Sequence, residues 1–192
     1  MNWNIRPFET IDQPALDACD FSFTTHKVLA LRKTARGLTT GWELLERDLE
    51  GQYTGNYGLS AAEWEVVRQR GESQAALLLV AAPQGAPIAL IDVGFEDWNE
   101  TARIWNLYVD VKQRGQGLGR QLIERAAEWA RGPERKARAL VVETQSNNHP
   151  ACQFYLTCGF ELSGIDDHFY SNNDREAKMG IGEVALFWYK PL

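Results

Sequence analysis

Three glycines alternate with larger residues in the segment Arg114-Gly115-Gln116-Gly117-Leu118-Gly119-Arg120. Glycine lets a backbone turn tightly and approach a ligand without side chains in the way. A helical pattern begins at Gly117, and the first amides of a helix have no hydrogen-bond partners inside that helix. These amides and the helix dipole attract an anion such as a pyrophosphate, and Arg114 and Arg120 add positive charge. The segment therefore predicts an anion site at the start of a helix.

Other phosphate-binding motifs fit this segment less well. A Walker loop, GxxxxGK[ST], is absent, and a GxGxxG fingerprint that began at Gly115 would need a glycine where Arg120 stands. The glycine spacing alone is weak evidence, and its place between a predicted strand and a predicted helix makes it informative. A glycine-rich connection that binds nothing is the other interpretation.

A second group of residues surrounds a short predicted helix at 148–158. Asn148 and Tyr155 are seven residues apart, so they share one helix face at a distance of about 10 Å, with the small Ala151 between them. An extended thiol-bearing arm could run past Ala151, with the Asn148 amide bonded to it and the Tyr155 phenol donating a proton to a departing thiolate. The spacing is equally compatible with a helix-capping asparagine and a core tyrosine.

Hydrophobic periodicity predicts the elements that position these residues. The stripe Leu118, Leu122, Ala126 and Trp129 predicts a helix over 117–131. Ser60 and Glu63 form a capping box that predicts a helix ending at Gly71. Strands are expected at residues 3–6, 75–82, 87–95, 102–111, 139–142, 160–165 and 184–189, and a short helix at 14–18.

Other segments are less clear. Residues 21–50 fit strand or helix, Gly51–Gly58 reads as a loop, and 171–182 as a loop or hairpin tip.

This order of elements predicts an α/β (α+β) fold with a mixed, mostly antiparallel sheet of about seven strands and helices on both faces. The helix at 117–131 is a crossover, so the strands before and after it should form a central parallel pair. No linker divides the chain. We therefore expect a single domain over 1–192, with a variable part at 1–74 and a core at 75–192.

Composition narrows the partners. The net charge of -6 and the pI of about 5.2 argue against nucleic acid and favour a cationic substrate. The three cysteines and three histidines lack metal-ligand spacing, so no metal site is predicted. There is neither an apolar run of roughly 18 residues nor a signal-peptide pattern, so we expect a cytoplasmic protein that does not bind membranes. Its state as monomer or homodimer stays open.

Several of these motifs together are similar to a known family. Leu107-Tyr108-Val109, then Arg114 to Gly119, then Asn148-x-x-Ala151-x-x-Phe154-Tyr155-x-x-x-Gly159-Phe160 resemble the GNAT N-acetyltransferases over residues 75–192. The C-terminal third resembles the streptothricin acetyltransferase branch, which acetylates an amine on the β-lysine part of a cationic antibiotic. The phrases that carry this narrower resemblance are Glu143 to Asn148, Ala151 to Tyr155, Cys158 to Phe160, Asp166 with Tyr170, and Glu183 to Tyr189.

The resemblance implies acetyl-CoA as the cofactor and a small cationic amine as the acceptor. It also implies a parallel strand pair that splays to admit CoA, with the backbone of Leu107, Tyr108 and Val109 pairing with the pantetheine arm. Backbone amides of Arg114, Gly115, Gln116, Gly117, Leu118, Gly119 and Arg120 would hold the pyrophosphate. Asn148 and Ala151 would contact the arm, and Tyr155 would protonate the CoA thiolate.

The sequence departs from that branch at Trp105 and Asn106, where the branch has a Glu-Asp pair. Neither side chain can act as a general base. The candidate acids are Glu143, Asp92, Asp110, Asp166 and Glu183. Glu143 is favoured as a base or as an anchor for the substrate ammonium, and Asp92, Asp166 and Tyr170 are the other expected substrate contacts. A GNAT enzyme acting on a protein or peptide amine, and a non-catalytic acyl-CoA-binding module, are the alternatives.

Overall fold

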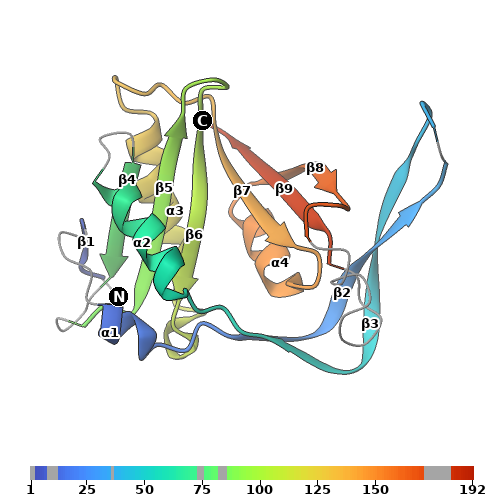
Figure 1. Ribbon diagram of the computed structural model, residues 1–192, viewed down its shortest axis with the longest axis horizontal. Helices are drawn as coiled ribbons and strands as arrows, with labels where there is room; N and C mark the ends of the chain where they lie inside the picture. Colours follow the sequence, from blue (N-terminus) through green and yellow to red (C-terminus); the bar gives the residue numbers. More distant parts are fainter. Residues whose placement is uncertain (1–2, 8–12, 36, 73–75, 82–85, 171–182) are drawn as a thin grey trace. The chain divides into compact units, whose positions relative to one another are not determined.

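A computed structural model describes the chain except for residues 1–2, 8–12, 36, 73–75, 82–85 and 171–182 (Figure 1). The helices are α1 (Gln13–Asp17), α2 (Ala61–Gly71), α3 (Leu118–Ala130) and α4 (His149–Thr157), and a 3₁₀ turn covers Val111–Gln113. The strands are β1 (Ile5–Pro7), β2 (Phe23–Lys33), β3 (Trp42–Gly55), β4 (Ala76–Ala81), β5 (Ala89–Glu96), β6 (Thr101–Val109), β7 (Ala139–Gln145), β8 (Glu161–Asp166) and β9 (Ala185–Pro191).

In the described part of the chain, seven strands form one sheet in the order β1-β4-β5-β6-β7-β9-β8, and β2 and β3 form a second. The strands β1, β4, β5 and β6 pair antiparallel, whereas β6 and β7 pair parallel. This confirms the predicted mixed sheet and the parallel pair joined by the α3 crossover. For the helices and strands whose ranges were predicted from the sequence, the observed boundaries agree to within two residues, except that β7 continues to Gln145.

The chain divides into two compact units. The first contains residues 1–22, 56–142 and 189–192, and the second contains 23–55 and 143–188. No helix in the described ranges is both long and apolar enough to cross a membrane.

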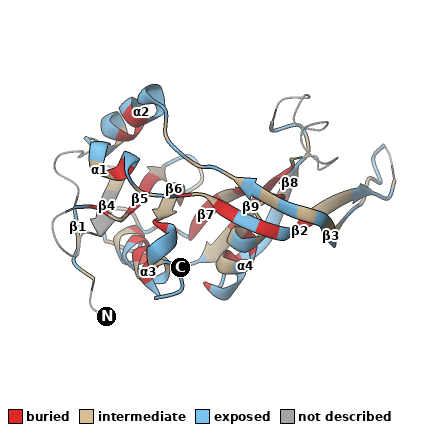
Figure 2. Cartoon of the chain, turned by 90° about the horizontal axis from the view of Figure 1, so that it is seen from below, coloured by how far each residue is buried: buried red, intermediate tan, exposed pale blue. Residues whose placement is uncertain are grey.

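In the first unit, helices cover both faces of the strands. Figure 1 shows α2 on one side of β4 and β5 and α3 on the other. Of the stripe read from the sequence, Leu118, Leu122 and Ala126 are buried and Trp129 is half-buried. Figure 2 shows α3 with both buried and exposed positions. Burial of these apolar side chains holds α3 against the sheet, and a 3₁₀ turn and the glycine loop connect the end of β6 to its start.

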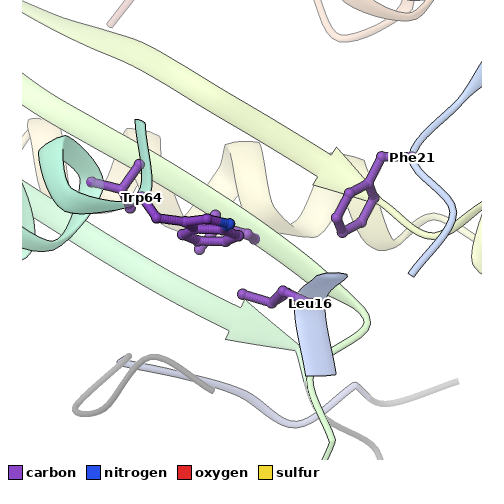
Figure 3. Close-up of a cluster of buried hydrophobic side chains, with 5 residues drawn as sticks. Leu16, Phe21 and Trp64 are labelled. Atoms are coloured by element: carbon purple, nitrogen blue, oxygen red, sulfur yellow. The ribbon is translucent and has the colours of Figure 1, made fainter. Parts of the chain in front are cut away.

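A second core lies under α1 and α2. Leu16, Phe21 and Trp64 meet there (Figure 3), and Val67 and Leu90 complete the buried cluster. The indole N–H of Trp64 donates to a carboxylate oxygen of Asp17 at 3.1 Å, so the polar end of this large side chain is satisfied. The cluster joins both helices to β5.

A β-bulge interrupts the pairing of β5 with β6. Asp92 pairs with Asn106, but Val93 pairs with Ile104, so Trp105 is the extra residue. A bulge locally re-aims the side chains beside it. Trp105 is exposed and Asn106 is partly buried.

In the second unit, β2 and β3 form a long hairpin. The expectation of a loop over Gly51–Gly58 is wrong as far as Gly55, because β3 continues to that residue and Phe23 pairs with Gly55. A Cβ atom at Gly55 would clash with the ring of Phe23. This glycine therefore serves close cross-strand packing and does not mark a turn.

We expect Ser60→Ala to lower the free energy of unfolding by about 1 kcal/mol. The Ser60 hydroxyl accepts from the Glu63 N–H at 3.3 Å, and the Glu63 carboxylate accepts from the Ser60 N–H at 2.7 Å. Urea unfolding followed by circular dichroism measures the change, with the exposed Ser163→Ala as the matched control. Equal stability of the two variants would remove the capping box as a stabilising feature.

Candidate functional site

The end of β6 leads into the glycine loop. Parallel pairing with β7 runs from Thr101–Ala139 to Ile104–Val142, whereas antiparallel pairing with β5 continues to Val109, opposite Ala89. Leu107, Tyr108 and Val109 therefore pair with β5 along one edge and lie past the last β6–β7 pair, Ile104–Val142. The strand end predicted to meet the pantetheine arm is therefore paired along one edge, and it belongs to the first unit.

Asp110 fixes the chain where β6 ends. One oxygen of its carboxylate accepts from the Lys112 N–H at 2.8 Å, and the other accepts from the Asp20 N–H at 3.0 Å. This buried side chain caps the 3₁₀ turn and joins it to the segment after α1. Its described contacts are structural.

Arg114 also holds the loop in place. Its Nε donates to the carbonyl of Val109 at 2.9 Å and its Nη1 to the carbonyl of Ser22 at 2.6 Å. Burial lowers the pKa of the guanidinium. The sequence suggested a charge that faces phosphate, but the described contacts of this side chain are with backbone carbonyls.

Two of the three glycines need their residue type for the backbone. Gly115 has φ 74° and Gly117 has φ 85°, in the left-handed region that other residues adopt only with strain. Gly117 is the N-cap of α3 and no side chain caps the helix, so the first amides of α3 are left for an external partner. The loop surface is exposed and a Cβ atom at either glycine would meet nothing within 4 Å.

This geometry fits an anion. The side chain of Leu118 is buried in the core while Gln116 and Arg120 are exposed, so only backbone amides and polar groups face outward. A helix start of this kind, with a nearby arginine, is suited to a phosphate group.

A buried carboxylate lies on the strand beside this site. Asp92 is 0% exposed, and its Oδ2 accepts from Arg70 Nη1 and, at 3.0 Å, from Asn106 Nδ2. Burial raises the pKa of Asp92, while Arg70 and the hydrogen bond from Asn106 oppose that rise. The sequence predicted Asp92 as a substrate contact, but its described contacts are internal.

Tyr108 extends this chain of hydrogen bonds. Its hydroxyl donates to Asn106 Oδ1 at 3.1 Å, and its ring stacks on Phe21 with 5.1 Å between the centroids. Burial raises the pKa of Tyr108 to about 12, with Glu63 and Asp92 adding to the effect. The phenol therefore stays neutral at physiological pH and acts as a donor.

The Trp105 ring packs against two arginines. The guanidinium carbons of Arg70 and Arg103 lie 4.6 Å and 4.4 Å from its centroid. Arg70 thus contacts both Trp105 and the buried Asp92. From the sequence, Trp105 and Asn106 were noted only as positions that lack the acidic pair of the related branch. A partner for Asp92 could have been predicted, because a buried charge is normally paired.

In the second unit, α4 carries the residues predicted to meet the thiol. Asn148 caps the helix by accepting from the Ala151 N–H at 3.1 Å. Tyr155 is buried, with ring centroids 5.3 Å from those of both Phe154 and Phe160 in edge-on contacts. Asn148 is therefore a helix cap and Tyr155 is a core side chain, which was the alternative interpretation of their spacing. Their roles toward a thioester stay predictions.

Two residues that the sequence named for the acceptor come together in this unit. The Tyr170 hydroxyl donates to the Glu143 carboxylate. Asp166 is exposed and accepts from the His168 N–H at 2.8 Å, a local turn contact. Tyr170 and Glu143 form a pair, whereas the described contact of Asp166 lies within its own segment.

The second unit also holds a polar cluster that the sequence did not predict. Asn147 is 1% exposed, and its Nδ2 donates to Glu183 Oε1 at 2.6 Å and to the Tyr53 hydroxyl at 3.3 Å. Burial, followed by the charge of Glu183, raises the pKa of Tyr53. The sequence had named only Glu183 of these three, as a candidate acid. Its contact with Asn147 and the contact of Asn147 with Tyr53 could not be predicted, because Tyr53 is distant from the other two in the sequence.

Cys152 and Cys158 are both buried, as small apolar side chains usually are. Burial raises the pKa of Cys152 to about 11, so its thiol is protonated at neutral pH. This argues against a nucleophilic role.

Comparison with known proteins gives a consistent result. A model of the acetyltransferase (GNAT) family matches residues 34–160. A streptothricin acetyltransferase from Escherichia coli is 39% identical over 92 residues, which are 48% of this chain and 49% of that protein. One from Streptomyces lavendulae is 28% identical over 183 residues, which are 94% of this chain and 90% of that protein. The match with the E. coli protein thus spans about half of its length.

A solved structure agrees along the whole chain. The crystal structure of a candidate streptothricin acetyltransferase from Bacillus anthracis, in complex with acetyl coenzyme A, has a TM-score of 0.78 and 28% identity. The similarity covers 100% of this chain and 98% of that chain.

We expect Gly117→Ala to lower the free energy of unfolding by about 1 kcal/mol and to weaken acetyl-CoA binding, because a Cβ atom is strained in the left-handed region. Thermal unfolding and isothermal titration calorimetry measure the two effects. Gly58→Ala is the matched control, since Gly58 also has open space around its Cβ position but no positive φ. If both variants bind acetyl-CoA like the parent, the conformation of Gly117 is not needed for the site.

Proposed function

This chain belongs to the GNAT acetyltransferase family, and from that premise we propose that it moves the acetyl group of acetyl-CoA to a primary amine of a small cationic molecule of the streptothricin type. The observation that carries the cofactor assignment is the uncapped start of α3 at the left-handed Gly117, in the loop that connects β6 to that helix. The relatives named streptothricin acetyltransferase support the acceptor class.

The residues of the first unit fit acetyl-CoA. In this proposal, the backbone of Leu107 to Val109 pairs with the amides of the pantetheine arm, and the amides of 114–120 bind the pyrophosphate. Acetyl-CoA supplies an activated acetyl thioester when bound. In this proposal a backbone N–H near Val109 polarises the thioester carbonyl, and the pairing of β6 with β5 supports that part of the strand.

The second unit supplies the groups proposed for the leaving thiol and the acceptor. Tyr155 donates a proton to the CoA thiolate, and Asn148 and Ala151 line the arm. Glu143, whose carboxylate is fixed by Tyr170, anchors the substrate ammonium or takes its proton. An alkylammonium with a pKa near 10.4 must lose a proton before its nitrogen can attack. Asp166 and Glu183 add negative charge to the same unit, which suits a cationic acceptor.

Replacing Tyr155 by phenylalanine tests the acid. The phenyl ring keeps the edge-on contacts with Phe154 and Phe160 but has no proton to give. We expect kcat to fall roughly 100-fold, while the KM for acetyl-CoA stays within about twofold. Steady-state kinetics on Tyr155→Phe, with Tyr189→Phe as the control tyrosine, give both values. Unchanged turnover would remove Tyr155 from the mechanism.

The acceptor is tested by measuring free CoA release with acetyl-CoA and four amines: streptothricin, spermidine, an aminoglycoside and a short peptide. We expect rapid turnover with streptothricin and slow or no turnover with the peptide. Preferential turnover of the peptide would instead support an enzyme that acts on protein amines. Tight acetyl-CoA binding without turnover of any amine would support a binding module.

A further inference from the structure

We propose that the side-chain oxygen of Asn106 receives an N–H of the acceptor amine, and that Asp92 is the positioning residue that turns this oxygen toward it. The inference rests on the proposed acetyltransferase function and deepens it, because it names the group that orients the attacking nitrogen. All residues that carry it belong to the first unit.

Asn106 lies next to the part of β6 that is proposed to bind acetyl-CoA. It directly precedes Leu107 to Val109, the stretch that β5 holds through the pairs Ile91–Leu107 and Ala89–Val109. Its side chain is partly buried, unlike that of its pairing partner Asp92, which is fully enclosed. Of the two, only the amide can touch a substrate.

Asp92 fixes which end of that amide is presented. Only the NH₂ group can donate to a carboxylate, and Nδ2 does so at 3.0 Å. A flipped amide would set its oxygen against the carboxylate oxygen, so Oδ1 is turned away from Asp92. Arg70 binds the same carboxylate oxygen and compensates its charge. The orientation of the Asn106 amide is therefore set by the Arg70–Asp92 ion pair.

The surroundings of Asp92 strengthen this bond. Its second oxygen, Oδ1, is buried and has no hydrogen-bond partner among the described residues. A carboxylate with so few donors and no solvent contact polarises the groups that do bond to it. Donation of an N–H to an anion raises the negative partial charge on the oxygen of the same amide. Asn106 Oδ1 is in consequence a stronger acceptor than an ordinary surface amide.

This oxygen still has acceptor capacity. An amide oxygen has two lone pairs, and the Tyr108 hydroxyl uses one of them at 3.1 Å. The second can accept an N–H from the acceptor amine, which directs the nitrogen lone pair toward the thioester at the end of β6. Asn106 takes no proton in this arrangement. The amine proton leaves to solvent or to the general base as the C–N bond forms and the C–S bond breaks.

The test is a double-mutant cycle on Asp92→Asn and Asn106→Ala, read as kcat/KM for streptothricin and as the Kd of streptothricin for the CoA-loaded enzyme. We expect Asn106→Ala to lower kcat/KM by about 10- to 100-fold and Asp92→Asn by about tenfold. The double variant should be no worse than Asn106→Ala, because Asp92 acts only through that amide. The Kd of acetyl-CoA should stay within about twofold in every variant.

A swapped variant adds a rescue. In Asp92→Asn with Asn106→Asp, the amide donates from β5 to a carboxylate on β6, so the outward oxygen again carries negative charge. We expect its kcat/KM to exceed that of Asp92→Asn. Arg103→Lys is the control, since Arg103 stacks on Trp105, as Arg70 does, but its described contacts do not include Asp92. It should leave the acceptor kinetics within about twofold.

Multiplicative effects of the two substitutions, or a swapped variant no better than Asp92→Asn, would overturn the inference. Should Asp92→Asn fail to fold, as judged by thermal unfolding and acetyl-CoA binding, unchanged acceptor kinetics in Asn106→Ala would still overturn it. These results leave the acetyltransferase function intact whenever the parent enzyme turns over streptothricin in the same assay. A parent that binds acetyl-CoA but acetylates no amine would instead refute the proposed function, and the inference with it.

Discussion

The parallel pairing of β6 with β7 is the constraint on which the site depends. Two parallel neighbours cannot be joined by a tight turn, so the chain must cross over, and here it does so through α3. The crossover helix has to start where β6 ends. Its unpaired amides therefore lie beside the last residues of that strand, and the left-handed Gly117 makes the change of direction possible.

The same strand is stabilised from its other edge. β5 pairs with β6 as far as Val109, and a bulge interrupts this pairing at Trp105. Beside the bulge, Arg70 of α2 contacts both Trp105 and Asp92. A buried carboxylate is unfavourable unless it is paired and hydrogen-bonded. Arg70 from α2 and Asn106 from β6 meet that need, so a single charge joins a helix and two strands around the strand end proposed to bind acetyl-CoA.

The chemistry proposed for this GNAT protein is divided between its two units. The first contains the cofactor strand, the glycine loop and the Asp92–Asn106–Tyr108 chain of hydrogen bonds. The second contains Tyr155 and the Glu143–Tyr170 pair. The cofactor part rests on backbone geometry that many side chains would allow. The acceptor part rests on individual charged and hydroxyl groups, which is where differences in substrate can arise.

The sequence by itself determined the features that depend on near neighbours in the chain. The capping box of Ser60, the apolar stripe of α3 and the glycines at 115 and 117 all act within a few residues, so periodicity and residue type were enough to find them. Tertiary structure decided the rest. Gly55 is in a strand because Phe23 packs over it, Arg114 bonds the carbonyl of Ser22, and Tyr170 meets Glu143 across 27 positions. A hydrogen bond between distant residues leaves no periodic trace, because its partners are brought together only by the packing of the elements that carry them.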